Sequence, residues 1–508
     1  MKNYTLDEVI AQSKSKRVIP LIDRLFSGSE TPLSVFEKLA ADKPGSFLLE
    51  SAEHGVWARY SFVGVNARGF LSKQLDGAPI WKSPNGAAAF PNGQSDMPET
   101  ALGALRSMHA AWSSPPSVDD ADLPPLTNGL VGVLGWDVIR EIEELPNPPA
   151  SDYRAPLMGM SVFEDLVILD HKTDSLLLVA NIFVEDQSDI PALYASAEQR
   201  LALMRQGIAQ PSPVFLAELN LTGDVVSKPQ TPHEDFLAAV ESAKGFVRIG
   251  DVFQVVLSQR FDIDLSASPL DVYRVLRSLN PSPYMYLLNF EDDTGAYAVV
   301  GASPESLVQV KGGHVVTHPI AGSRPRGQSL DQDDALTDSL VADAKERAEH
   351  LMLVDLARND LLRVCKSDSV AVTEFMQVHK YSHIMHLVST VEGELRSDQN
   401  AIDAFKATFP AGTLSGAPKP RALEIIDELE VSNRGIYGGV VGYFDFAGNA
   451  DLAIAIRTAY LRDGIAHIQA GAGIVLDSVP QTEFEETISK ASASMRAVLA
   501  ANELKKVN

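Results

Sequence analysis

Strand-forming segments follow one another without an intervening helix near the C-terminal end of the chain. Residues 440–446, 451–461 and 465–476 are β-rich and are separated only by the short turns 447–450 and 462–464, which predicts an antiparallel meander. Long helical patterns lie outside this block, notably at residues 333–364 and 418–429. Because helices and strands come in blocks and do not alternate regularly, the sequence favours an α+β fold over a doubly wound parallel sheet.

A second strong local signal begins at Thr231-Pro232-His233-Glu234. This pattern predicts a capping box with proline at the first helical position, and the helix is predicted to end at Gly250. Residues 251–260 then alternate as in a strand, with Gln254 on the more polar face.

Two stretches of the chain lack periodicity and are rich in Gly, Pro, Ser and Asp. Residues 83–125 predict a loop around a short helix, and residues 206–231 separate an N-terminal from a C-terminal part. We therefore expect an N-terminal region of residues 1–215 and a C-terminal region of residues 230–498.

Composition excludes several classes of protein. A chain of 508 residues with 45% hydrophobic content can bury a large core, and its formal charge of −24 opposes binding to nucleic acid or to an anionic membrane. The sequence has no apolar run of signal-peptide or membrane-spanning length. Cys365 is the single cysteine, which suits a reducing compartment, so the cytoplasm is the expected location.

Two pairs of glutamates are candidates for a metal site. Glu346 and Glu349 are three residues apart in a helical pattern, as are Glu483 and Glu486, so each pair lies on one side of its helix. Such pairs are common on solvated helix faces. If the two pairs converge, the like charges need a cation, and Mg²⁺ fits because it prefers oxygen ligands and takes one or two protein carboxylates.

Several further segments could hold an anion. Residues 410–419 form a small-residue loop that enters a helix and carries Lys419, although a tight turn explains the loop equally well. Gly471 and Gly473 could let backbone amides approach a ligand, or could mark a strand bend. Arg457 lies in an apolar strand pattern and needs an anionic ligand or an internal salt bridge. The basic block of residues 319–327 is an anion-binding or ion-pair loop.

Taken together, ten segments of the C-terminal part resemble the chorismate-utilising enzyme family, in family order from about Pro232 to Val498. They are GDVFQVVLSQR, GASPESL, HPIAGSRPRG, AEHLMLVDLARNDL, YSHIMHLVS, FPAGTLSGAPKPRA, RGIYGGVVGY, AIRT, QAGAGIV and PxxExxETxxKA. The resemblance implies a four-layer α/β/β/α sandwich of two packed sheets. It also implies Mg²⁺ bound by Glu349 and Glu486, with Glu346 and Glu483 holding the surrounding waters.

The same resemblance implies a binding site for chorismate, which is a dianion. One carboxylate would be held by Mg²⁺ and the other by Arg457, Tyr437 and the amides around two glycines. The remaining expected roles are a proton donor for the leaving C4 hydroxyl at Glu305 and assistance to pyruvate loss by His386. The implied substrate-binding residues are Gly322, Ser323, Thr413, Tyr437, Arg457, Gly471, Ala472, Gly473 and Lys490.

Two positions distinguish the possible reactions within the family. Relatives that add water to chorismate carry a basic lysine where this chain has Gln254, and aminodeoxychorismate synthases carry a lysine nucleophile where it has Ala321. Both differences favour amination by ammonia and formation of anthranilate. The family threonine next to Gly322 is Ser323 here, which keeps the hydroxyl but loses the β-branch.

Two segments resemble those with which anthranilate synthases of the family bind tryptophan as a feedback inhibitor. The implied inhibitor-binding residues are Leu49, Glu50, Ser51, Pro283, Tyr284 and Met285. Because Cys365 lacks the surroundings of a glutaminase nucleophile, a separate glutamine amidotransferase subunit is expected to supply ammonia. The competing interpretations are an aminodeoxychorismate synthase, an isochorismate or salicylate synthase, and a non-catalytic tryptophan-binding subunit.

Overall fold

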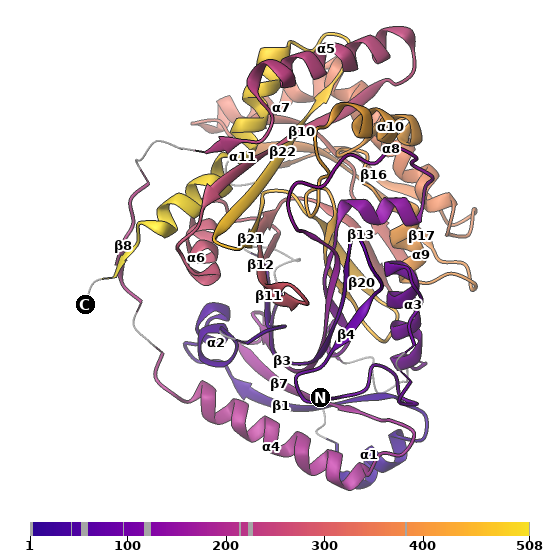
Figure 1. The fold of residues 1–508 in the computed structure, drawn as a ribbon, viewed down its shortest axis with the longest axis vertical. Coiled ribbons are helices and arrows are strands. Elements are labelled where there is room, and N and C mark those ends of the chain that lie inside the picture. The colour runs from indigo at the N-terminus through magenta and orange to yellow at the C-terminus, as the bar shows by residue number, and fades with distance from the viewer. Residues whose placement is uncertain are drawn as a thin grey trace.

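Antiparallel strands run through both the N-terminal and the C-terminal parts of the chain (Figure 1). The computed structural model describes residues 4–41, 43–51, 59–94, 96–115, 123–212, 215–221, 227–380 and 384–506. Within these ranges the α-helices are α1 (Leu6–Gln12), α2 (Pro32–Leu39), α3 (Ala101–Trp112), α4 (Ile190–Ile208), α5 (His233–Ile249), α6 (Pro269–Leu279), α7 (Leu330–Ala342), α8 (Ala344–Leu362), α9 (Ala401–Thr408), α10 (Lys419–Leu429) and α11 (Pro480–Asn502).

The strands of the N-terminal part are β1 (Val18–Phe26), β2 (Phe47–Glu50), β3 (Tyr60–Gln74), β4 (Ile80–Lys82), β5 (Leu130–Leu134), β6 (Pro156–Asp170) and β7 (Ser175–Phe183). The labelled strands β1, β3 and β7 lie low in the view of Figure 1. The short strands β8 (Ala217–Glu218) and β9 (Lys228–Pro229) follow in the segment between the two regions.

The strands of the C-terminal part are more numerous. They are β10 (Gln254–Asp264), β11 (Tyr284–Asp292), β12 (Gly295–Ser303), β13 (Ser306–Lys311), β14 (His314–Thr317), β15 (Ile320–Pro325), β16 (Ala371–Lys380), β17 (Ile384–Glu394), β18 (Gly416–Ala417), β19 (Val440–Phe444), β20 (Ala450–Ile454), β21 (Thr458–Arg462), β22 (Ile465–Ile474) and β23 (Lys505–Lys506).

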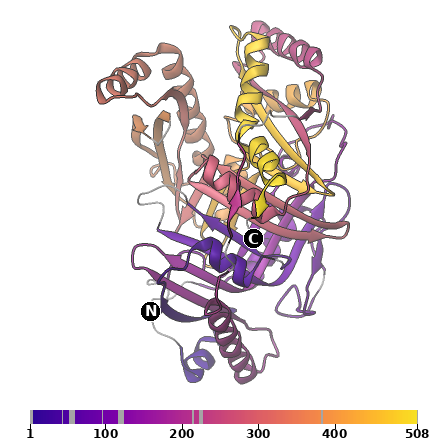
Figure 2. The same ribbon diagram turned by 90° about the vertical axis from the view of Figure 1, so that its left-hand side faces the viewer.

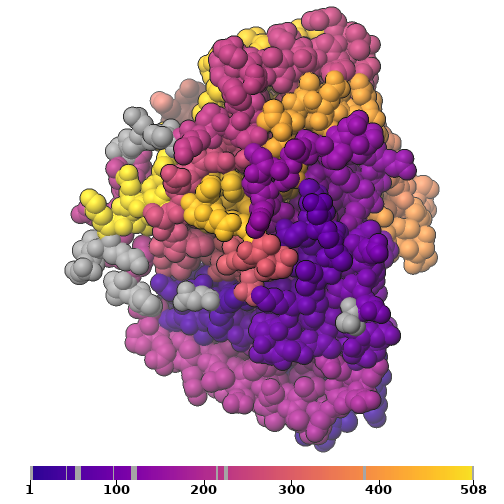
Figure 3. Space-filling view, in the orientation of Figure 1, coloured from indigo at the N-terminus to yellow at the C-terminus, as the bar shows by residue number. Residues whose placement is uncertain are grey.

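Strands from the two parts of the sequence pair with each other. β2 pairs with β11 and β5 pairs with β19, both antiparallel, so the hydrogen-bonded network of 21 strands includes both regions. Figure 3 shows the indigo-to-magenta and orange-to-yellow parts adjoining on one surface. The segment between the regions carries only the short β8 and β9 among its described residues.

Three apolar clusters show the layers of the fold. One lies between strands and contains Phe47, Phe163 and Tyr286. On either side of it lies a cluster in which helices pack on strands. The helices of one cluster are α3, α5, α8, α9 and α10. Those of the other are α1, α2, α4, α6 and α11. The order is therefore helix, sheet, sheet, helix, which confirms the predicted α+β class and its four-layer α/β/β/α arrangement.

The helix predicted after residue 231 is present but begins differently. α5 ends at Gly250, whose φ of +86° is the left-handed conformation that glycine adopts at low cost. At the other end Pro232 is the N-cap and no side chain caps the helix, so the predicted capping box is wrong. The long pattern at residues 333–364 is also two helices, because Asp343 adopts extended backbone and caps α8 through its own carboxylate.

The predicted meander is correct only in part. β19 pairs with β20, and β21 pairs with β22, but the run 451–461 is broken into two strands that turn to different neighbours, β13 and β12. The break contains Arg457, with a φ of +52°.

Helices from different parts of the chain stand at the upper end of the molecule. Figure 2 shows α11, in yellow, standing beside α5 at the upper end of the molecule, across from the helices of residues 330–362. The short helix predicted within residues 83–125 is α3. No helix in the described part of the chain is both long and apolar enough to cross a membrane.

Candidate active site

Two glycines of β22 face a pair of polar side chains. A β-carbon added to Gly471 would lie 2.8 Å from the Tyr437 hydroxyl, and one added to Gly473 would lie 2.6 Å from Nε2 of Gln254. Gln254 is the first residue of the neighbouring strand β10 and is 7% exposed. The missing side chains therefore make room for Tyr437 and Gln254. The side chain of Ala472 points into the helix-facing core, so only its backbone can serve the site.

Arg457 is placed by the break between β20 and β21. Its backbone carbonyl accepts a hydrogen bond from the amide of Ala302, and burial lowers the pKa of its guanidinium while the nearby Tyr437 opposes the shift. No carboxylate of the described residues forms a salt bridge with it, so the internal salt bridge considered from sequence is not found there. A largely buried cation of this kind favours an anionic ligand.

Glu305 lies in the short connection between β12, which ends at Ser303, and β13, which begins at Ser306. Thr413 Oγ1 donates a hydrogen bond to its Oε1 at 3.0 Å. Burial raises the pKa of this carboxyl to about 7, against the opposing effects of Thr413 and Lys490. Glu305 can therefore hold a proton near neutral pH.

His386 and Gly322 come together on β17 and β15. Gly322 is the extra residue of a β-bulge, with a φ of +71°, and its carbonyl lies 3.1 Å from His386 Nδ1. A carbonyl can only accept, so Nδ1 carries the proton and Nε2 keeps its lone pair. Burial lowers the pKa of His386, and Arg457 lowers it further. Ser323 is paired directly opposite His386 in the same ladder.

The four glutamates come from α8 and α11. Burial raises the pKa of Glu349, and the charges of Glu346 and Glu486 raise it further. Burial and Glu486 likewise raise the pKa of Glu483. The structure therefore brings the two pairs close enough to affect each other's ionisation.

Basic side chains lie among these carboxylates. Lys490 Nζ lies 2.7 Å from Glu486 Oε1 and donates to the carbonyl of Gly471 at 3.0 Å, while Arg324 lies 3.3 Å from Glu346. A β-carbon on Gly322 would lie 3.0 Å from Glu346, which connects the glutamates to the bulge beside His386. The predicted metal and substrate residues thus share one site.

The carboxylates fit Mg²⁺ as a donor set. Among the described residues no three His, Cys, Asp or Glu side chains are grouped closely enough to hold a metal by themselves. Mg²⁺ needs only one or two protein carboxylates when waters and substrate oxygens complete its shell. Glu349 and Glu486, one from each helix, meet that requirement, and a cation beside them would offset the negative charge that raises the pKa of Glu349 and Glu483.

Some predicted roles fit the structure less well. Lys419 is only 8% exposed and is paired with Asp360, so it does not present its charge to an anion as the sequence suggested. The basic block is an ion-pair segment, since Arg324 contacts Asp343 and Arg326 contacts Asp333. Residues 381–383 of the YSHIMH motif lie outside the described residues.

The profile of the chorismate binding enzyme family matches residues 83–496. The chain belongs to the chorismate binding enzyme family. Among members of this family, the anthranilate synthase component 1 of Arthrobacter globiformis is 48% identical, over 98% of this chain and 93% of its own. That of Aquifex aeolicus is 44% identical over 99% of both chains.

Solved structures of family members agree with the fold. The crystal structure of anthranilate synthase component I from Streptococcus pneumoniae TIGR4 aligns with a TM-score of 0.73 at 36% identity, covering 93% of this chain and 99% of its own. The menaquinone-specific isochorismate synthase of Escherichia coli aligns with a TM-score of 0.68 at 16% identity, over 97% of this chain and 98% of its own, which shows a shared fold.

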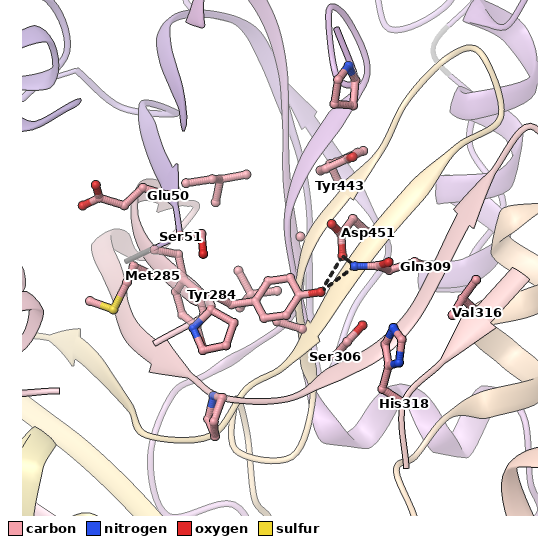
Figure 4. Close-up of a pocket in the computed structure, with 18 of the residues that line it drawn as sticks. Glu50, Ser51, Tyr284, Met285, Ser306, Gln309, Val316, His318, Tyr443 and Asp451 are labelled. Carbon is pink, nitrogen blue, oxygen red and sulfur yellow. Dashed lines mark hydrogen bonds between the residues drawn. The ribbon is translucent and has the colours of Figure 1, made fainter. Parts of the chain in front are cut away.

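This chorismate binding enzyme also has a larger cavity away from the glutamates (Figure 4). The cavity has a volume of about 500 Å³ and is lined by all six residues predicted to bind an inhibitor, Leu49, Glu50, Ser51, Pro283, Tyr284 and Met285. Its polar end at Ser51 has a buried Oγ without a hydrogen-bond partner among the described residues. The carboxylate of Glu50 is already bonded to Tyr273 and to Arg277.

Sequence patterns did not identify the opposite wall of this cavity. The Tyr284 hydroxyl donates to Asp451 at 3.0 Å and accepts from Gln309 at 2.8 Å. Beyond it, Glu374 accepts from Thr390 and bonds His379, both lining the cavity. Tyr284 was among the predicted residues, but its partners Asp451 and Gln309 and the residues beyond them come from distant strands and share no local motif, so no signal in the sequence joins them to it.

Proposed function

We propose that this chain converts chorismate and ammonia to anthranilate and pyruvate through 2-amino-2-deoxyisochorismate, as the synthase component of anthranilate synthase in tryptophan biosynthesis. The observation that carries the proposal is the position of Gln254 over Gly473, where its neutral amide cannot act as the base that activates water. Relatives matched over nearly their full length are named anthranilate synthase component 1, which supports the same reaction.

Substrate binding would use opposite charge at both ends of the dianion. Arg457 and Tyr437, with backbone amides around Gly471 and Gly473, would hold one carboxylate of chorismate. A Mg²⁺ held by Glu349 and Glu486 would offset the negative charge of the glutamates and hold the other carboxylate. Fixing both ends leaves the ring between the proton donor and the nucleophile.

In the first step ammonia attacks C2 while the C4 hydroxyl departs. The pKa of about 7 at Glu305 keeps a proton available for the leaving oxygen, and Thr413 orients the carboxyl. Ammonia is already nucleophilic when neutral, so Gln254 need not act as a base. Its amide can orient ammonia through hydrogen bonds.

In the second step the aminated intermediate loses pyruvate and becomes aromatic. This requires removal of the C2 proton, and His386 is the candidate because Nε2 retains its lone pair while Nδ1 is bonded to Gly322. The lowered pKa keeps the ring neutral near pH 7 and thus able to accept a proton.

Ammonia would come from a separate glutamine amidotransferase subunit in the cytoplasm. Cys365 is buried and burial raises its thiol pKa to about 11, so it does not supply a ready thiolate. Tryptophan would inhibit the enzyme from the cavity of Figure 4, where the Ser51 hydroxyl has no hydrogen-bond partner among the described residues and the mostly apolar walls suit an aromatic amino acid.

The test is formation of anthranilate from chorismate, followed by fluorescence, with Mg²⁺ and ammonium at alkaline pH and again with glutamine as nitrogen source. Product with ammonium and none with glutamine would support the proposed reaction and the need for a partner. A para-amino product would favour an aminodeoxychorismate synthase. Tryptophan binding without consumption of chorismate would favour a regulatory subunit.

A further inference from the structure

A second, smaller cavity adjoins Glu305. Its volume is about 60 Å³, whereas one water needs only about 10–15 Å³ of such space. The polar part of its lining consists of Glu305, Ser306, Thr317, His318, Asp360, Thr408 and Thr413. We refer to this cavity as the acid chamber.

One hydroxyl in the acid chamber points to a small polar occupant. Oγ1 of Thr317 is buried and forms no hydrogen bond with the described residues, and Thr317 itself is 6% exposed. A buried hydroxyl of this kind is normally satisfied by protein or by ordered water. The chamber also contains the carboxyl of Glu305, so a water there has several possible polar partners.

A buried ion pair completes the wall. Lys419 Nζ lies 3.0 Å from Asp360 Oδ2 and 3.4 Å from the carbonyl of Thr408. Burying such a pair often costs as much as the attraction returns, so it is weak evidence for a purely stabilising role. The proposed reaction does not use either residue directly, but Asp360 lines the same chamber as Glu305.

We propose that the acid chamber holds the water through which Glu305 regains its proton, and that it receives the water formed from the C4 hydroxyl of chorismate. The inference rests on the proposed function, in which Glu305 is the proton donor. Asp360 is a positioning residue: Lys419 holds it in place, and it orients the chamber water toward Glu305.

The step balances in atoms and charge. The carboxyl proton of Glu305 moves to the C4 oxygen, the C4–O bond breaks, and one water leaves into the chamber. The C2–N bond forms from the electron pair of ammonia, the two ring double bonds shift toward C4 to replace the electron pair that leaves with oxygen, and the resulting ammonium group releases one proton to solvent. One proton returns through the chamber water to the Glu305 carboxylate, so the cycle consumes no net proton.

The experiment fills the chamber and separates the two half-reactions. Ala357 lies on α8 in the chamber wall and is only partly buried, so Ala357→Leu adds bulk without rebuilding the core. We expect amination of chorismate by ammonium to slow by about tenfold or more, which is less than the roughly 10²–10⁴-fold that proton transfer itself contributes, because Glu305 is kept and only the return of its proton is impaired. Conversion of added 2-amino-2-deoxyisochorismate to anthranilate does not use Glu305 and should stay within about twofold.

Two further variants keep the result interpretable. The double variant Asp360→Asn with Lys419→Met removes both charges and should slow amination selectively in the same way. Asp355→Asn alters an exposed carboxylate on the same helix and should leave both half-reactions unchanged.

Three outcomes decide the matter. Selective loss of the first half-reaction supports the chamber. Equal loss of both half-reactions, or no loss in Ala357→Leu, overturns it. Failure of the unaltered enzyme to aminate chorismate would instead contradict the proposed function.

Discussion

Ser303 lies directly opposite Tyr284 in the antiparallel ladder of β12 and β11, two residues before Glu305. The preceding amide, of Ala302, donates to the carbonyl of Arg457 at 3.2 Å. The strand beside the cavity of Figure 4, β11, is therefore bonded to β12, which leads to Glu305 and bonds the backbone of Arg457. A shift of β11 caused by a ligand in the cavity has a direct route to both groups.

Tyr284→Phe should weaken tryptophan binding. The variant loses the hydroxyl that holds Asp451 and Gln309 in the wall of the cavity, so the polar wall that would face the ligand is no longer fixed; we expect about a tenfold loss of affinity, which corresponds to about 1.4 kcal/mol. Calorimetric titration with tryptophan and inhibition curves measure the effect. Tyr194→Phe removes a hydroxyl bonded to the distant Tyr4 carbonyl and should change neither. Unaltered inhibition in Tyr284→Phe would place the inhibitor elsewhere.

Amination should lose activity as pH rises through about 7, when the concentration of free ammonia is held constant. Glu305 donates a proton only in its protonated form, and its pKa is raised to about 7, so the active form is full below that pH and depleted above it. Glu305→Gln should cut the rate by roughly 10²–10⁴ and remove this descending limb from kcat/KM. If the decrease in kcat/KM at high pH persists in Glu305→Gln, a group other than Glu305 causes it.

His386→Ala should release 2-amino-2-deoxyisochorismate in place of anthranilate. Nε2 of His386 is the proposed acceptor for the C2 proton, so only the second step loses its base. Chromatography of the products detects the intermediate, and added imidazole should restore part of the anthranilate. Parallel loss of both steps would make His386 a structural residue.

Arg457→Met should weaken chorismate binding without lowering the free energy of unfolding. Burial disfavours the charged guanidinium, and no described carboxylate pairs with it, so its removal should leave the free energy of unfolding unchanged or raise it by about 1 kcal/mol. Chorismate binding should weaken by about 2–3 kcal/mol, because a charged partner is lost. Denaturant unfolding and equilibrium binding provide the two measurements.

Arg462→Met is the matched control for that comparison. Arg462 lies five residues further on and is paired with buried Asp292 at 2.7 Å. Its removal leaves a buried charge alone and should cost about 3–5 kcal/mol of stability. Destabilisation of the same size in Arg457→Met would reveal a partner for that residue.

Gly473→Ala should impair amination more than folding. The new β-carbon would lie 2.6 Å from Nε2 of Gln254. The flexible end of this side chain can move aside, but it would then no longer lie over residue 473. We expect kcat for amination to fall by about tenfold while the unfolding midpoint changes little. Gly245→Ala, in open space on α5, is the control and should stabilise the helix by up to about 1 kcal/mol. Full activity in Gly473→Ala would show that the position of Gln254 is not needed for the reaction.

Local patterns in the sequence predicted much of the framework. The helix that ends at Gly250, the strand that carries Gln254 and the block arrangement of the C-terminal strands all follow from signals within a few residues of one another. The four layers followed from the resemblance to a family. The capping box at Thr231 was wrong, because the side-chain bond it requires is replaced there by a proline N-cap.

Charge pairing could not be predicted, because partners far apart in sequence decide it. Lys419 looks like an anion ligand within its own loop, but Asp360 on α8 reaches it across the fold. Arg457 could have been half of an internal salt bridge, but at the strand break it forms none with a carboxylate of the described residues.

The sequence by itself thus determined which residues form helices and strands and where the backbone needs glycine, since these features depend on near neighbours and on backbone sterics. Only the tertiary structure decided that Glu305 meets Thr413, that glutamates of α8 and α11 affect each other, and that Tyr284 meets Asp451. Those contacts join residues more than a hundred positions apart in the sequence, and burial at each contact influences whether a group is charged.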